Sequence, residues 1–204
     1  EITIGDWSSD VCSSDLINKK VKEAINQKGQ IYTIDIVSQM FKEIDAKHKG
    51  SVLDTDEEFD KLLLAMGVTL NAREKRTFLK NTLKVEDDTV SLSSFLSFLL
   101  PEIPKTRKKV VDEGFKRLNP DGDETINKET LTKRFGNNSD EKYTTIGGRR
   151  VLISKIVNEI LEMFDFNDDG EFTEADFLNY YKELSSSFDD DDFFNSMIKA
   201  SWEL

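Results

Sequence analysis

The sequence holds few of the residues from which most catalytic and zinc sites are built. Its 204 residues include one Cys, Cys12, and one His, His48. These counts argue against a disulfide framework, a zinc cluster, a Cys–His pair and a His-centred triad. A Gly-rich phosphate-binding loop is also absent from the sequence. The sequence therefore predicts a protein that is not an enzyme, with a carboxylate pair in an Asp-rich loop as the one catalytic alternative.

Glycine, proline, positive charge and long apolar runs are scarce as well. Ten Gly and three Pro favour a helical chain over a turn-rich β fold. With 40 acidic against 28 basic residues, the net charge of -12 argues against nucleic acid or anionic lipid as the main partner. No apolar run is long enough to span a membrane. Hydrophobic residues still make up 37% of the chain, and 14 Phe can build a core.

The first 16 residues do not read as ordinary protein. Residues 6–16 match, in register, the translation of a sequencing-library adapter. A natural Ser/Asp-rich tail is the alternative. We expect residues 1–16 to be an adapter-derived artefact.

Beyond that segment, apolar residues recur at offsets of three and four, the spacing of an amphipathic helix. This pattern predicts helices over residues 37–44, 59–66, 92–99, 153–164 and 177–184. A last short helix is predicted through Phe194, Met197, Ile198 and Trp202. Residues 137–148 are predicted to form a polar loop.

Two prolines divide the helical part of the chain. Pro101 and Pro104 each disfavour helix in the residue before them, so residues 101–104 form a linker. The expected parts are an N-terminal lobe (17–100), this linker, a C-terminal lobe (105–188) and a C-terminal helix (189–204). The predicted fold class is all-α: four EF-hand helix–loop–helix units in two lobes, with short β pairing between the loops of each lobe.

The best copy of the repeated loop, loop four, runs from residue 165 to residue 176. Short oxygen-bearing side chains at positions 1, 3 and 5 of an EF-hand loop point at a calcium ion. Asp165, Asn167 and Asp169 hold these positions, and Gly170 at position 6 allows the left-handed turn that wraps the chain around the ion.

The second half of loop four completes the ligand set but departs from the usual pattern at its end. Glu171 would ligate through its carbonyl and Thr173 through water, while Phe172 would pair with a partner loop. Asp176 stands where Glu usually supplies both oxygens, and its shorter side chain suits Mg²⁺ better than Ca²⁺. We expect one divalent ion here, Ca²⁺ or Mg²⁺; a loop shaped by hydrogen bonds alone is the alternative.

Loop three, residues 119–130, keeps the frame with weaker ligands. Glu124 replaces the glycine at position 6, where a left-handed residue would cost about 1 kcal/mol or more, and Thr130 replaces the final acid. A weak or empty metal site is predicted. Its candidate ligands are Asn119, Asp121, Asp123 and Thr125.

Loops one and two keep the frame and lose the ligands. Loop one opens at Asp45, but Lys47 and Lys49 occupy ligand positions and would repel a cation. Gly50 and Val52 stand at the turn and sheet offsets, and the segment 50–58 is two residues longer than the standard frame.

Loop two, residues 83–94, begins with Leu83 and ends with Ser94, and only Val90 keeps the sheet position. Both N-terminal loops are therefore predicted to be structural and free of metal.

The order of these motifs resembles that of the calcyphosin family. The residues that carry the resemblance are 40–45, 57–59, 66–68, 94–101, 115–118, 177–181, 190–194 and 201–204. The resemblance implies a four-hand, two-lobe, cytoplasmic calcium-binding protein without catalytic activity. This sequence departs from the family in the ligands of loops one, two and three.

Two functional interpretations follow. The first is a non-enzymatic calcium-binding protein, a weak calcium sensor or an adaptor in signalling that binds an unknown protein or an amphipathic peptide. The second is a constitutive protein-interaction module in which metal is only structural or absent.

Overall fold

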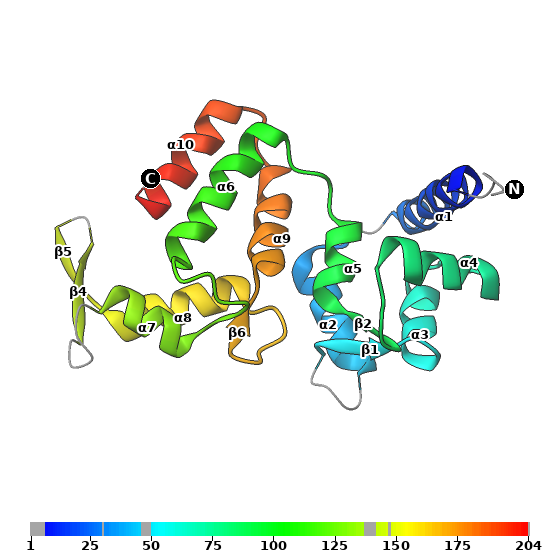
Figure 1. Cartoon of the computed structure of the whole chain (residues 1–204), viewed down its shortest axis with the longest axis horizontal. Coiled ribbons are helices and arrows are strands. Elements are labelled where there is room, and N and C mark those ends of the chain that lie inside the picture. The colour runs from blue at the N-terminus through cyan, green and yellow to red at the C-terminus, as the bar shows by residue number, and fades with distance from the viewer. Residues whose placement is uncertain (1–6, 30, 46–49, 137–141, 147, 204) are drawn as a thin grey trace, which may run out of the picture. The chain divides into compact units, whose positions relative to one another are not determined.

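The structure is a computed structural model that describes residues 7–29, 31–45, 50–136, 142–146 and 148–203. It is rich in helices, which alternate with short antiparallel strand pairs (Figure 1). The chain divides into two units, Glu1–Leu99 and Leu100–Leu204. Within the described ranges, no helix is both long enough and apolar enough to cross a bilayer.

Unit 1 contains two helix–loop–helix halves preceded by a helix. Its elements are α1 (Trp7–Gln27), α2 (Ile34–Ile44), β1 (Val52–Asp54), α3 (Glu57–Ala65), α4 (Ala72–Thr77), the π-helical turn η1 (Phe78–Thr82), β2 (Thr89–Ser91) and α5 (Leu92–Leu99). Helix α1 includes residues 7–16 of the suspected adapter segment, whose origin stays a prediction.

The core of unit 1 is built around phenylalanine rings. Phe95 lies 6.0 Å from both Phe41 and Phe59, measured between ring centroids, and Phe78 lies 6.4 Å from Phe59. All four side chains are fully buried. The helical spacing predicted burial for Phe41, Phe59 and Phe95, and the structure adds Phe78 from η1.

The strand pairing of unit 1 is shifted by one residue from the register that the sequence predicted. Val52 stands at the sheet position of the standard frame, but Val90 pairs with Leu53. Leu53 is fully buried, whereas Val52 is half-buried and pairs with Ser91. The extra residues in loop one explain the correction, because a shift by one residue turns the neighbouring side chain toward the core.

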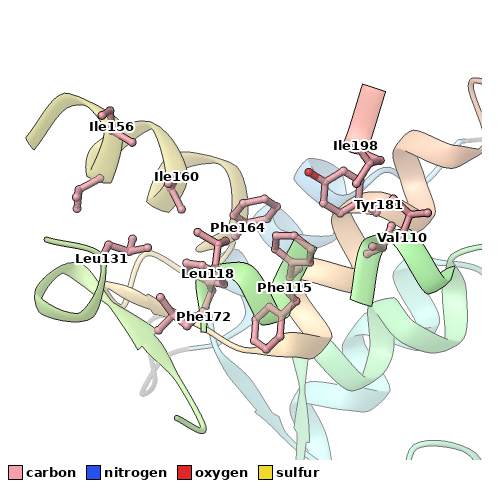
Figure 2. Packing of buried hydrophobic residues seen from close by; sticks show 14 of the residues in the cluster. Val110, Phe115, Leu118, Leu131, Ile156, Ile160, Phe164, Phe172, Tyr181 and Ile198 are labelled. Atoms are coloured by element: carbon pink, nitrogen blue, oxygen red, sulfur yellow. The ribbon is translucent and has the colours of Figure 1, made fainter. Parts of the chain in front are cut away.

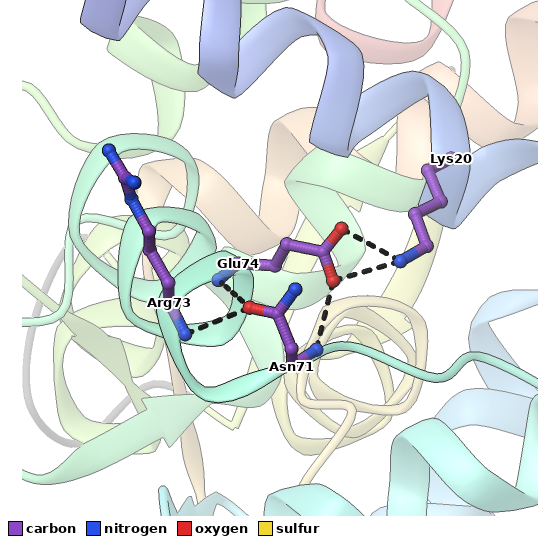
Figure 3. A network of polar contacts seen from close by, with 4 residues as sticks. All are labelled: Lys20, Asn71, Arg73 and Glu74. Atoms are coloured by element: carbon purple, nitrogen blue, oxygen red, sulfur yellow. Dashed lines mark hydrogen bonds and ion pairs between the residues drawn. The ribbon is translucent and has the colours of Figure 1, made fainter.

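A polar network joins α1 to the start of α4 (Figure 3). Asn71 caps α4 by accepting hydrogen bonds from the N–H groups of Arg73 and Glu74, at 3.0 and 2.9 Å. The Glu74 carboxylate accepts the Asn71 N–H at 2.9 Å and both of its oxygens lie 2.8 Å from Lys20 Nζ. The hydrogen bond from Lys20, with that from the Asn71 N–H, holds the pKa of Glu74 below its usual value. The capping box thus also anchors α1.

Unit 2 has the same two-halved plan with two additions, a β-hairpin and a last helix. Its elements are α6 (Lys105–Leu118), β3 (Ile126–Asn127), α7 (Lys128–Phe135), β4 (Tyr143–Ile146), β5 (Arg149–Leu152), α8 (Ile153–Phe164), β6 (Glu171–Phe172), α9 (Glu174–Ser185) and α10 (Asp191–Trp202). Loop three lies between α6 and α7, and loop four between α8 and α9.

The two loops of unit 2 meet through β3 and β6. Ile126 pairs with Phe172, and both side chains are buried in the core that Figure 2 shows. Both residues hold position 8 of their loops, so the predicted pairing of these loops is confirmed. Phe164, at the end of α8, packs against Phe172 with 5.2 Å between ring centroids. The strand pair therefore places the start of loop four over the core.

The segment predicted as a polar loop between α7 and α8 contains a hairpin. Tyr143 pairs with Leu152 and Thr144 with Val151 across β4 and β5. Arg150 stacks over the ring of Tyr143, with its guanidinium carbon 4.2 Å from the ring centroid. Tyr143 and the β-branched residues that follow it, Thr144 to Ile146, favour a strand. The prediction of a loop was therefore wrong over 143–146.

Helix α10 packs on α6 through its buried residues Phe194 and Ile198. The buried Arg107 guanidinium holds it at one end, where it pairs with Asp191 and lies 5.0 Å from the centre of the Phe194 ring. Hydrogen bonds from Arg107 and then Thr106 keep the pKa of Asp191 below its usual value. At the other end, Trp202 Nε1 donates to the Tyr181 hydroxyl at 2.9 Å.

The approach of α10 to α6 depends on the absence of a side chain at Gly114. A Cβ at this position would lie 2.8 Å from Trp202 Cδ1. We predict that Gly114→Ala lowers the free energy of unfolding by about 1 kcal/mol, because overpacking outweighs the gain in helix propensity. Introduced into the Trp202→Ala variant, the same change should instead stabilise by up to about 1 kcal/mol. Urea unfolding of the four proteins measures both effects, and equal effects in the two backgrounds would contradict the contact.

Candidate metal centre

Loop four is closed around the carboxylate of its first residue. Asp165 Oδ1 accepts the Asp169 N–H at 3.1 Å, and Oδ2 accepts the Gly170 N–H at 2.8 Å. Gly170 adopts φ +92°, a left-handed conformation that side chains rarely take, as its place at position 6 predicted. Asp168 is also left-handed, at φ +57°, which Asp tolerates better than most residues.

The predicted ligands Asn167 and Asp169, which follow Asp165 in the loop, are hydrogen-bonded to each other. Asn167 Nδ2 donates to Asp169 Oδ2 at 2.6 Å, and Asp169 Oδ1 accepts the Glu171 N–H at 3.0 Å. The Glu171 side chain turns to loop three, where its Oε2 accepts the Thr125 hydroxyl at 3.0 Å. Asn167 and Asp169 therefore share one hydrogen-bonded turn with Asp165, and Glu171 joins loops three and four.

Thr173 and Asp176 form a second set at the start of α9. Asp176 Oδ2 accepts both the N–H and the hydroxyl of Thr173, at 2.9 and 2.7 Å. The Thr173 hydroxyl oxygen in turn accepts the Asp176 N–H at 3.3 Å, which completes a capping box. This contact fixes Asp176 Oδ2 toward the helix start and leaves Oδ1 outside the box.

Several carboxylates lie close together in loop four and repel one another. Burial raises the pKa of Asp165 above its usual value, and the charges of Asp169 and Asp168 add to this increase. The N–H groups of Gly170 and Asp169 act in the opposite direction. A cation among these oxygens would lower the pKa again, so metal and protons compete for Asp165.

The structure thus gathers the predicted ligands of loop four in two hydrogen-bonded sets. Within the described part of the chain, no three acidic, His or Cys side chains form a group that could hold a metal ion. The donor set itself consists of carboxylate, amide, hydroxyl and carbonyl oxygens, which is the chemistry that Ca²⁺ and Mg²⁺ prefer. The residues fit such an ion by their chemistry and their order along the loop.

Loop three is closed by an amide. Asn119, which is 8% exposed, donates from Nδ2 to the Asp123 carbonyl at 2.7 Å, and its Oδ1 accepts the Asp123 N–H at 2.9 Å. The neutral amide satisfies both a donor and an acceptor of the loop. The two hydrogen bonds close the loop within the protein.

The turn of loop three also differs from that of loop four. The left-handed residue is Gly122, at φ +73°, and not Glu124, which holds position 6. Asp121 and Asp123 are exposed. Gly122 stands at position 4, where loop four has the left-handed Asp168, so the difference lies at position 6 alone. A right-handed Glu124 avoids the strain that a left-handed conformation would bring there.

Loop one keeps a closed form through two buried carboxylates. Asp45 Oδ2 accepts the Gly50 N–H, and Gly50 adopts φ +88°. Glu58 is 7% exposed and accepts the Asp54 N–H at 2.9 Å, a role that the sequence did not indicate. With two extra residues in the loop, Glu58 stands where the standard frame has its final acid. Lys47 and Lys49 lie outside the described residues.

Loop two is closed by hydroxyl groups and apolar side chains. Ser91 Oγ accepts the Ser94 N–H at 3.1 Å and donates to Ser94 Oγ at 2.9 Å, so it caps α5. Leu83, at position 1, is buried in the core. These contacts close the loop and cap α5 within the protein, and its freedom from metal stays a prediction.

Two known proteins align with most of the chain. The crustacean calcium-binding protein 23 of Faxonius limosus is 26% identical over 168 residues, which cover 81% of each chain. The calcium-binding protein LPS1-beta of Lytechinus pictus is 22% identical over 158 residues, which cover 78% of this chain and 59% of that protein. No family model matches the chain.

The amide bridge of loop three can be tested by Asn119→Asp. A carboxylate oxygen would face the Asp123 carbonyl in place of the amide donor, so in the presence of chelator the variant should be destabilised by about 1–3 kcal/mol. Urea unfolding measures the loss. Asp121→Asn changes an exposed side chain of the same loop and should shift stability by less than about 0.5 kcal/mol. Equal stability of Asn119→Asp and the parent protein would show that the bridge does not order the loop.

Proposed function

We propose that the chain is a non-enzymatic calcium-binding protein with four EF-hand units, of which the fourth binds the metal. The observation that carries the proposal is loop four itself, in which Asp165, Asn167, Asp169 and the left-handed Gly170 occupy one tight turn between two helices. The names of the two aligned proteins, both calcium-binding, support the same role.

In this proposal the loop exchanges its internal hydrogen bonds for bonds to the ion. Asp165, Asn167 and Asp169 supply side-chain oxygens, Glu171 its backbone carbonyl, and Thr173 an oxygen through water. The like charges that raise the pKa of Asp165 become favourable once a cation neutralises them. Binding should therefore stabilise unit 2, by about 2.7 kcal/mol when free metal exceeds the Kd a hundredfold.

The choice between Ca²⁺ and Mg²⁺ rests on Asp176. The capping box turns its Oδ2 toward Thr173, so one oxygen, Oδ1, is left for the ion. A single oxygen at position 12 suits the lower coordination number of Mg²⁺, whereas Ca²⁺ gains from two. We propose a weak calcium site that Mg²⁺ also enters, in a protein that acts as a sensor or as an adaptor for a partner segment.

A constitutive interaction module is the second candidate, and the closed loops one, two and three favour it. Amides, hydroxyls and buried carboxylates order these loops through hydrogen bonds within the protein. The two candidates differ in whether metal changes the apolar surface. Binding of an apolar dye with and without chelator separates them, because only a sensor exposes more apolar surface on loading.

The ligand role of loop four predicts the outcome of Asp165→Ala. Loss of the first ligand should abolish most of the heat of metal binding in a calorimetric titration. Asp168→Asn is a matched control, because it removes a charge from the same turn at a position that is not a ligand, and Asn tolerates the left-handed backbone. The control should keep the stoichiometry of one. Full stoichiometry in Asp165→Ala would falsify the assignment.

The geometry at position 12 predicts the effect of Asp176→Glu. The longer side chain of glutamate can turn both oxygens to the ion in exchange for its place in the capping box, while the Thr173 hydroxyl still caps α9. Calcium affinity should rise by about tenfold or more while Mg²⁺ affinity changes less. Parallel titrations with both ions check this. Calcium binding that is equal to or weaker than that of the parent protein would show that Asp176 is not limiting.

A further inference from the structure

Unit 2 contains a groove of about 740 Å³ whose lining includes no residue of loop three, loop four or the β3–β6 pair. We name it the α8 groove, because Ile156, Ile160 and Met163 line it along one face of that helix. Tyr180 from α9 and Met197 and Trp202 from α10 line it as well. The lining is largely apolar, and its volume lies in the range that binding sites commonly have.

Part of this lining is open to solvent. Met163 is 36% exposed, although it lies one turn after the buried Ile160 on the same face of α8. Tyr180, Met197 and Trp202 are half-buried. Exposed methionine and aromatic side chains around a concave surface are typical of sites that bind another polypeptide.

Three arginines border the groove in a strongly acidic protein. Arg117 and Arg134 are adjacent, since Arg134 Nε donates to the Arg117 carbonyl at 3.0 Å, and Arg149 comes from the hairpin. None of the three has an ion-pair partner among the described residues. Of the two carboxylates that also line the groove, Glu159 lies 3.7 Å from Lys155 and Glu203 belongs to the C-terminal end of α10.

The side of the groove that α7 and the hairpin form has the same sign of charge in its sequence. Residues 128–155 contain seven Lys and Arg against three Asp and Glu, although the whole chain carries -12. Guanidinium groups beside an apolar surface attract carboxylates that approach with apolar side chains. The complement of this surface is a segment with an apolar stripe and acidic flanks.

We propose that the α8 groove binds an acidic amphipathic helix of a partner protein. The proposal rests on the adaptor role proposed above and names the chemistry of the partner. The arginines come from three separate elements, α6, α7 and the hairpin, so they offer spaced contacts to several carboxylates along a helix. A single lipid headgroup would use only one such point.

The groove adjoins the metal loop through one aromatic residue. Phe164 directly precedes Asp165, and its ring centroid lies 5.1 Å from that of Tyr180 and 6.2 Å from that of Trp202. Both neighbours line the groove. Metal in loop four should therefore change the affinity of the groove for the helix through Phe164. The groove itself does not depend on the metal, because side-chain packing forms it.

The test uses two designed 18-residue peptides that share leucines at helical spacing. One carries Glu at all other positions and the second carries Lys. Trp202 fluorescence reports binding in the full chain with Trp7→Phe, which leaves one indole in the protein. The acidic peptide should bind and the basic one should bind at least tenfold more weakly. The preference should shrink as salt is raised.

Two paired variants locate the binding surface. Arg134→Gln with Arg149→Gln removes two guanidiniums from the groove and should weaken the acidic peptide about tenfold at low salt. Arg73→Gln with Arg76→Gln makes the same change of net charge on α4 of unit 1 and should leave the affinity unchanged. Met163→Gln, at an exposed position, should weaken binding without unfolding the chain.

Several results would overturn the inference. Equal affinity for both peptides would do so, as would equal losses of affinity in the two double variants. So would binding to phosphatidylserine vesicles in place of the acidic peptide, or a stable dimer of the chain that buries the groove. Repeating the titration with chelator and in Asp165→Ala separates this inference from the metal proposal. Peptide binding that persists where no metal binds upholds the groove and removes the metal switch, whereas metal binding without peptide binding does the reverse.

Discussion

The antiparallel pairing between two loops is the contact on which each unit depends. A helix–loop–helix half has one apolar face and cannot bury it alone, so two halves must meet. In unit 2 the pairing of Ile126 with Phe172 brings them together, and in unit 1 the pairing of Leu53 with Val90 does so. All four side chains are buried, and each pair thus joins backbone hydrogen bonds to core packing. The start of loop four takes its place over the core from this pairing.

Much of this plan could be predicted from helical spacing and loop frames. The apolar stripe 153–164 became α8 with its bounds intact, and Gly170 is left-handed as its position required. The register of loop one could not be predicted, because the frame does not say where extra residues are absorbed, and Leu53 rather than Val52 entered the core.

Other features of unit 2 depend on contacts that a linear pattern does not contain. The hairpin forms from a segment whose polar residues suggested a loop, and loop three is left-handed at Gly122 but not at Glu124. The spacing of Asp176 from Thr173 predicted that Asp176 caps α9. It did not predict that the cap would engage Oδ2 and leave only Oδ1 outside the box. The arginine-bordered groove was not predicted at all, since Arg117, Arg134 and Arg149 are brought together only by the fold.

The residue at position 9 of three loops caps the following helix, namely Ser91, Asn127 and Thr173. Since these caps satisfy the helix starts without help from an ion, a loop can lose its ligands one at a time while its helices persist. Metal-ligating positions are then free to drift under mutation wherever selection on binding is relaxed. Loop three is an example, because the amide of Asn119 closes the loop while Asn127 independently caps α7.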